Sequence, residues 1–340
     1  MEVIMKIRRQ TLPVSALFAI LALFAGFMMP TAHASPIADD GTGDQPVSTS
    51  APSVNSPRSS TQNLDPTGYW TEEKMQSAIP ADELASGFYQ TDTKPSSQQS
   101  KGVSLGEDLS HPVYPELPTV TQTRNAVVPS TAGKVFFTYK GKNYVCSGSA
   151  INGSTKNVVS TAGHCVHGGK GEGWHSNIAF APAYYNGVSG YDLWNWKTAH
   201  TFKGWTDSSD FSRDQAFFTV HPRNGRSLVA TVGGNGLSYN YGHNQTGVRI
   251  WGWPAEKPYH GTTPYYCDGN TRKRGFWSSD MVMPCGMTGG ASGGSWLRTR
   301  INANLGYVYG VTSRGTTSGD KLLISTPFDN AVKDLFRGVK

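Results

Sequence analysis

The chain has 340 residues, a formal net charge of +6 and four cysteines. Its basic balance raises the question of nucleic acid, but the basic residues are scattered apart from the run 272–274, and no nucleic-acid motif accompanies them. The cysteines form no C-x-x-C pair, which argues against a zinc site. We therefore expect no nucleic-acid partner and no metal.

The first 34 residues have the pattern of an export signal. Three basic residues precede the apolar run LPVSALFAILALFAGFMM, and Ala32 and Ala34 are the small residues that signal peptidase needs. A membrane anchor is the alternative, because the run approaches the length of a span. The A-x-A site and the lack of a later apolar stretch favour cleavage after Ala34. We expect a secreted, extracellular protein with no membrane attachment after signal cleavage.

Residues 35–125 form an acidic segment that differs from the rest of the chain. They carry 12 acidic and 5 basic side chains, a net charge of −7, whereas residues 126–340 carry +11. The segment is rich in Ser, Thr, Pro, Gly and Gln, so we expect it to be largely disordered, apart from a short helix within 69–79. Its charge predicts a precursor segment that docks on the basic domain as an inhibitor or folding aid. An inert linker is the alternative.

Residues 126–340 have the pattern of a β-rich domain. Short β-branched and aromatic runs such as KVFFTY, NVVSTA, QAFFTV and YVYGVTS alternate with turn residues. This pattern predicts an all-β barrel or sandwich, and about 215 residues suffice for two small barrels that share a cleft. A helix is predicted at the end, with Thr326 as its cap and Val332, Leu335 and Phe336 on one face.

An even number of cysteines in an exported chain indicates two disulfides. The sequence does not fix their connectivity. We expect the sequential pairing of Cys146 with Cys165 and of Cys267 with Cys285, because each bond closes a short loop.

Two short motifs carry the chemistry: TAGHC, which contains His164, and GGASGGSW, which contains Ser292. A hydroxyl is a weak nucleophile at neutral pH, so it needs a nearby base, and that base needs a buried anion to orient it. The glycines around Ser292 allow a tight turn that aims amide N–H groups at a developing oxyanion. Taken separately, His164 could be a structural neighbour of a disulfide, and Ser292 a turn serine.

Chain order decides between reaction classes. The serine motif also fits the G-x-S-x-G elbow of α/β-hydrolases, but no histidine follows His260, as that class requires. A subtilisin-like order needs an acid before His164, where Glu116 in the acidic segment is the one acidic residue after Asp108. Only the order His, Asp, Ser survives.

The acid that fits this order best is Asp214. It leads directly into the apolar strand of RDQAFFTV, so its carboxylate can be buried at a strand edge. Asp210 lies in the polar stretch SSDFS and is better explained as a loop residue.

TAGHC, the D-x-A-hydrophobic motif at Asp214 and the G-x-S-G-G loop resemble the chymotrypsin (trypsin-like) serine proteases over about residues 127–340. The stretches GWP at 252–254 and MTGGASGGSW are most similar to the secreted bacterial branch related to glutamyl endopeptidases. The resemblance implies two six-stranded antiparallel β-barrels with a cleft between them and a C-terminal helix. It also implies a monomeric serine endopeptidase that acts on polypeptides and needs no cofactor.

The resemblance assigns a role to each matching residue. Ser292 attacks the scissile carbonyl, His164 moves the proton, and Asp214 holds the imidazole. The amides of Gly290 and Ser292 form the oxyanion hole, and Ser313 lies near the acid. A catalytically silent, secreted binding protein of the same fold is the alternative to an enzyme.

The chain also departs from the pattern of animal trypsin-like enzymes. Ala291 replaces the aspartate before the nucleophile and no IVGG-like start exists, so activation has to differ, by removal of the acidic segment after Arg124. Gly286 stands where the trypsin pocket carries an acid, and Thr312 where glutamate-specific relatives carry a histidine. We expect a neutral pocket with Met287 and Thr312, and with Arg314 and the basic run 272–274 at its rim.

Overall fold

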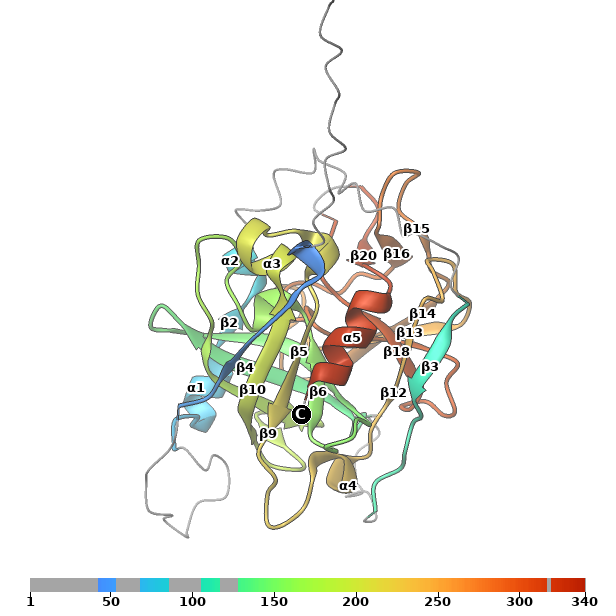
Figure 1. Ribbon diagram of the computed structural model, residues 1–340. Coiled ribbons are helices and arrows are strands. Elements are labelled where there is room, and N and C mark those ends of the chain that lie inside the picture. The colour runs from blue at the N-terminus through green and yellow to red at the C-terminus, as the bar shows by residue number, and fades with distance from the viewer. Residues whose placement is uncertain (1–41, 53–67, 86–104, 117–127, 317–318, 340) are drawn as a thin grey trace, which may run out of the picture. The chain divides into compact units, whose positions relative to one another are not determined.

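The computed structural model describes residues 42–52, 68–85, 105–116, 128–316 and 319–339 (Figure 1). The predicted export signal, residues 1–34, lies outside these ranges, and so does Arg124. None of the helices in these ranges is long and apolar enough to cross a membrane.

The first half of the domain is a closed six-stranded antiparallel barrel. Its strands follow the order β10-β11-β6-β5-β4-β7, and β7 pairs with β10 to close the ring. The six strands are β4 (Ala132–Tyr139), β5 (Lys142–Ile151), β6 (Val158–Thr161), β7 (Ser176–Pro182), β10 (Trp194–Phe202) and β11 (Ala216–Val220). Successive side chains of a strand point to opposite faces, so in β4 Val135 and Phe137 enter one core cluster while Phe136 enters another. Burial on both faces explains the continuous apolar run of KVFFTY.

The second half of the domain is built from two smaller sheets. One has the order β14-β13-β17-β18-β12, and the other β15-β16-β20-β19. The Cys267–Cys285 disulfide links the two sheets, because Cys267 lies on β14 and Cys285 directly follows β16. The strands are β12 (Gly236–Tyr239), β13 (Val248–Gly252), β14 (Tyr265–Gly269), β15 (Arg272–Lys273), β16 (Met281–Pro284), β17 (Ser295–Arg298), β18 (Tyr307–Val311), β19 (Arg314–Gly315) and β20 (Leu322–Ser325).

Short elements connect these sheets. They are the strands β8 (Tyr184–Tyr185) and β9 (Val188–Ser189), the helices α3 (Lys203–Ser208) and α4 (Leu228–Val232), and the 3₁₀ turns η2 (Gly163–Cys165) and η3 (Phe211–Arg213). The η2 and η3 turns matter most here, because they carry two of the predicted site residues.

The chain ends in helix α5 (Asn330–Gly338), as predicted, with Val332 and Leu335 buried. Its cap differs from the prediction: Asp329, not Thr326, accepts the N–H of Val332, at 3.2 Å. The helix starts later because the residues before it still belong to a sheet, where the N–H of Phe328 donates to the carbonyl of Tyr309 at 2.8 Å.

Three stretches of the acidic segment add strands to the domain. Strand β1 (Pro46–Ser50) pairs with β10, β2 (Ile79–Pro80) runs parallel to β5, and β3 (Glu107–Ser110) pairs with β12 (Figure 1). The prediction of disorder does not hold for these stretches, because each satisfies its backbone hydrogen bonds on a strand of the domain. Their other elements are the 3₁₀ turn η1 (Thr42–Asp44) and the helices α1 (Glu72–Gln76) and α2 (Asp82–Ala85).

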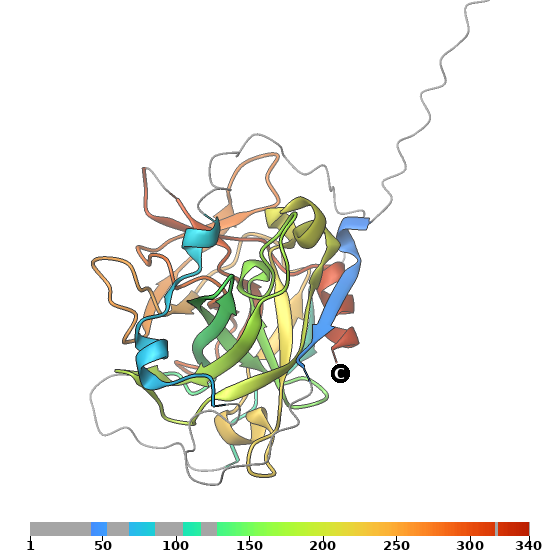
Figure 2. The ribbon, with the colours of Figure 1, turned by 90° about the vertical axis from the view of Figure 1, so that its left-hand side faces the viewer.

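Charge also connects the acidic segment to the domain. Asp44 pairs with Arg213 at 2.5 Å, and Asp108 with Arg298 at 3.3 Å. Helix α1 lies within the predicted helical stretch 69–79, and the hydroxyl of Thr71 caps it. Figure 2 brings the light-blue residues 68–85, which contain α1 and α2, into view.

Candidate active site

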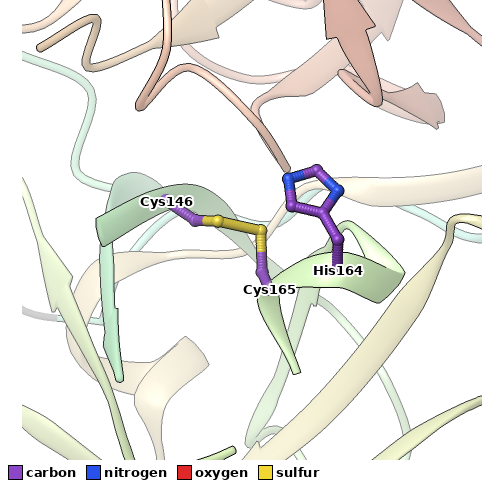
Figure 3. A group of neighbouring side chains, drawn as sticks. All are labelled: Cys146, His164 and Cys165. Atoms are coloured by element: carbon purple, nitrogen blue, oxygen red, sulfur yellow. A yellow bond between two sulfur atoms is a disulfide. The ribbon is translucent and has the colours of Figure 1, made fainter. Parts of the chain in front are cut away.

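His164 lies in the η2 turn, directly after strand β6. The next residue, Cys165, is bonded to Cys146 of β5, so the predicted disulfide ties this turn to the barrel wall (Figure 3). Trp205 of α3 lies beside the imidazole, with 6.2 Å between the ring centroids. A side chain at Gly163 would come within 3.1 Å of Asp214 Oδ1, so the turn needs glycine at this point.

Asp214 follows η3 and leads into β11, and only 1% of it is exposed. Its Oδ1 accepts the backbone N–H of His164 at 2.8 Å, and its Oδ2 lies 2.9 Å from His164 Nδ1. Ser313 Oγ donates to the same Oδ2 at 2.7 Å. The sequence-predicted acid, base and neighbouring serine therefore form one buried chain of hydrogen bonds. His164 Nε2 has no hydrogen-bond partner among the described residues.

The charges of this pair stabilise each other. Burial is the largest influence on His164 and by itself would lower its pKa, but the charge and hydrogen bond of Asp214, and the charge of Asp82, raise the pKa of His164 above its ordinary value. Burial would likewise raise the pKa of Asp214, but His164 and the hydrogen bond from Ser313 hold that pKa below its usual range. The pair is therefore suited to hold a proton on the imidazole opposite a carboxylate anion.

His175 supports this arrangement and was missed by the sequence reasoning. Its Nε2–H donates to the carbonyl of His164 at 3.1 Å, and its ring stacks on Phe137 with 4.3 Å between centroids. Burial lowers the pKa of His175 to about 3, so the ring is neutral at physiological pH. No motif surrounds His175 in the sequence, and its role depends on a stacking partner from a different strand.

Ser292 lies in a tight turn from the second half of the domain. Gly290 and Gly293 have φ angles of +95° and +80°, which favour glycine. The backbone N–H of Ser147 on β5 donates to the carbonyl of Ser292 at 2.7 Å, which attaches this turn to the first barrel. Ser147 Oγ also donates to the carbonyl of Gly290 at 2.8 Å. Ser147 therefore orients the backbone of the predicted oxyanion hole, a role that its motif did not reveal.

The hydroxyl of Ser292 is not hydrogen-bonded to His164. Ser292 Oγ donates to Oδ1 of Asp82 at 3.0 Å, and the backbone N–H of Gly290 donates to Oδ2 of the same carboxylate at 2.8 Å. The structure thus joins two predicted site residues through an acidic side chain of the precursor segment. The sequence gave no motif around Asp82.

A cavity of about 410 Å³ lies beside Ser292. Met287, Thr312 and Arg314, the residues assigned to the specificity pocket from the sequence, line it. Arg314 is paired with Asp280 at 2.7 Å, so its charge is largely balanced. The exposed Lys321 also lines the cavity, whereas the basic run 272–274 is not among the residues that line it.

No family model matches the chain. The thermostable serine protease AL20 from an extremophilic microorganism is 30% identical, with a TM-score of 0.58 over 61% of this chain and 95% of that one. The protease Anisep from Arthrobacter nicotinovorans is 31% identical, with a TM-score of 0.58 over 62% of this chain and 96% of that one. The structure of a Glu endopeptidase in complex with MPD matches at 18% identity and a TM-score of 0.51, over 64% and 93%, which shows the fold alone.

The closed barrel, the β-rich second half and these relatives define a protease of the chymotrypsin fold, as predicted. The chain belongs to the chymotrypsin-fold serine proteases. Both 30%-identical relatives are microbial, and the fold of the Glu endopeptidase also matches, consistent with the glutamyl-endopeptidase-like branch predicted from the motifs.

A curated relative has a different name. The "Extracellular metalloprotease" of Bacillus subtilis (strain 168) is 30% identical over 118 residues, which are 34% of this chain and 35% of that protein, so the match spans about a third of the relative's length. Among the described residues, the candidate metal ligands that cluster are Cys146, His164 and Cys165. They do not fit a metal ion, because both sulfurs are bonded to each other and His164 Nδ1 contacts Asp214 (Figure 3).

Proposed function

We propose that this protein is a secreted serine endopeptidase that hydrolyses peptide bonds through an acyl-enzyme. Ser292 Oγ attacks the scissile carbonyl carbon while His164 Nε2 takes its proton. The N–H groups of Gly290 and Ser292 stabilise the oxyanion, and Asp214 stabilises the imidazolium. The imidazolium then gives its proton to the leaving amine, and a water activated by His164 releases the acyl group by the reverse sequence.

One observation carries this proposal: the buried Asp214 carboxylate holds His164 by Nδ1. A neutral imidazole that donates from Nδ1 has its lone pair on Nε2, the atom a general base needs. The Ser313 hydroxyl supplies a further donor to the carboxylate, so the anion is stabilised although it is buried. The order His, Asp, Ser along the chain and the microbial serine proteases among its relatives support the same reaction class.

The proposed location is extracellular, with signal cleavage after Ala34 and later removal of residues 35–125. Two disulfides support export, because such bonds persist mainly in oxidising compartments. The substrates are polypeptides, and the mature domain, residues 126–340, acts as a monomer without a cofactor.

A fluorophosphonate probe tests the activated serine. The protein is expressed with its own N-terminal segment, and the processed form is labelled and read by intact mass. We expect one adduct on the wild type and none on Ser292→Ala or His164→Ala. His221→Ala, which replaces an exposed histidine, is the matched control and should label like the wild type. If a folded, processed wild type takes no adduct, the enzyme proposal fails and a silent binding protein of the same fold replaces it.

A further inference from the structure

The Asp82 carboxylate occupies the position that a reacting carbonyl would take. One of its oxygens is 3.0 Å from Ser292 Oγ, and the other is 2.8 Å from the N–H of Gly290. A negatively charged oxygen at such a donor has the charge of the oxyanion that forms during peptide hydrolysis. The carboxylate belongs to a side chain, so it presents no peptide bond to the nucleophile.

The backbone before Asp82 is held against the same site. Residues 79 and 80 form strand β2, which runs parallel to β5. The N–H of Ala81 donates to the carbonyl of Val145 at 3.0 Å, and Ala81 is fully buried. These contacts lie next to Cys146 and Ser147, the part of β5 that positions the turns of His164 and Ser292. The carboxylate is therefore placed by ordered backbone and not by a free chain end.

Further contacts anchor the N-terminal part of this segment. Trp70 is 2% exposed, its Nε1–H donates to the carbonyl of Asn177 at 2.7 Å, and its ring lies 5.3 Å from that of Phe136. Met75 of α1 enters the same core cluster. Tyr69 donates to Asn143 Oδ1 at 2.8 Å. Buried aromatic anchors of this kind are typical of specific interfaces.

The contact with Asp82 disables the predicted relay. The Ser292 hydroxyl donates to Asp82, which leaves His164 Nε2 without a partner among the described residues. The charge of Asp82 is also one of the influences that raise the pKa of His164, which favours the imidazolium, a form unable to act as a base. Substrate cannot use the oxyanion hole while the carboxylate holds the N–H of Gly290.

We propose that residues 68–85 are a built-in inhibitor, whose Asp82 carboxylate fills the oxyanion hole and captures the hydroxyl of Ser292. This inference rests on the proposed endopeptidase function and identifies the partner that the site binds before activation: an acidic peptide of this chain. A cut in the chain after Asp82 leaves the segment held by non-covalent contacts alone, and its release frees the site.

The test measures fluorophosphonate labelling of the unprocessed full chain, which intact mass distinguishes from processed molecules. Charged hydrogen bonds of this kind are strong enough that we expect Asp82→Asn and Asp82→Ala to label roughly tenfold faster or more than the unprocessed wild type. Glu73→Gln removes an exposed charge from the same segment and is the matched control, with an unchanged rate. Equal rates for the wild type and both Asp82 variants would overturn the inference.

A second arm covers the case in which an Asp82 variant fails to fold. A synthetic peptide of residues 68–85 is added to the processed wild type, and we expect it to slow labelling. The same peptide with Asp82→Ala should need a roughly tenfold higher concentration for the same effect. Equal potency of the two peptides, or no inhibition by either, contradicts the inference. If the processed protein takes no label in the absence of peptide, it is the proposed function that fails.

Discussion

Replacing Asp214 by asparagine keeps the shape of the side chain but removes its charge and one of its acceptor oxygens. In the structure Oδ1 accepts the backbone N–H of His164, which can only donate. Oδ2 faces His164 Nδ1 and the hydroxyl of Ser313, and both of these can become acceptors. We therefore expect the amide of Asp214→Asn to place its oxygen at Oδ1 and its NH₂ group at Oδ2.

That orientation moves the imidazole proton to Nε2, the atom that has to take the proton of Ser292. It also removes the charge that stabilises the imidazolium. The same change in another protease of this mechanism lowers kcat by about 10⁴. At about 1.36 kcal/mol for each factor of ten, this is roughly 5 kcal/mol of transition-state stabilisation. We expect a loss of about this size in the kcat/KM of the processed enzyme.

The assay is hydrolysis of a chromogenic peptide, with thermal unfolding as the check on folding. Asp210→Asn is the matched control, because Asp210 caps η3 by accepting the N–H of Ser212 at 2.8 Å. Asparagine caps a helix about as well as aspartate, so kcat/KM should not change. A folded Asp214→Asn enzyme with activity close to that of the wild type would refute the reasoning, because the tautomer of His164 would then be set by other groups.

Three other predictions concern the backbone, a buried cation and a disulfide. Gly290→Ala should lower kcat/KM roughly a hundredfold, because its φ is +95° and a Cβ would lie 2.7 Å from a backbone oxygen, whereas Gly275→Ala, with open space around it, should keep full activity in the same assay. Burial lowers the pKa of Lys134 from 10.5 to about 7, so between these values the folded chain has lost a proton that the unfolded chain keeps. The free energy of unfolding should therefore rise as pH increases through this window, and urea titrations should show no such rise for Lys134→Met; an equal rise in both proteins would contradict the assignment. Replacing Cys146 and Cys165 by alanine should lower the free energy of unfolding by about 3 kcal/mol, since the bond spans 19 residues, and an unchanged urea midpoint would argue against this.

Local motifs and chain order were enough to predict much of the site. The sequence placed His164, Asp214 and Ser313 in one group, and the structure joins them by hydrogen bonds. It also predicted the pairing of the two disulfides, because each bond closes a loop of fewer than twenty residues. These features depend on residues that carry their own chemistry or are close together in the chain.

The features that were missed depend on pairings between distant parts of the chain. Asp82 lies in the stretch PADELA, which has no motif, and its role appears only where β2 meets β5. The stretches PVSTS and EDLS have little apolar content, and they become strands because β10 and β12 offer them free edges. His175 was missed for the same reason, since its stacking partner Phe137 comes from a different strand. Propensity and composition cannot show such contacts.

The two added strands have a consequence for the enzyme after processing. Loss of β1 would leave Thr198–Phe202 of β10 without the backbone partners of residues 46–50, and loss of β3 would expose β12 in the same way. Unpaired edges of this kind are where sheets add foreign strands and begin to aggregate. While the precursor is intact, the acidic segment therefore also acts as a solubility device, and processed molecules at high concentration should be most prone to self-association along these two edges.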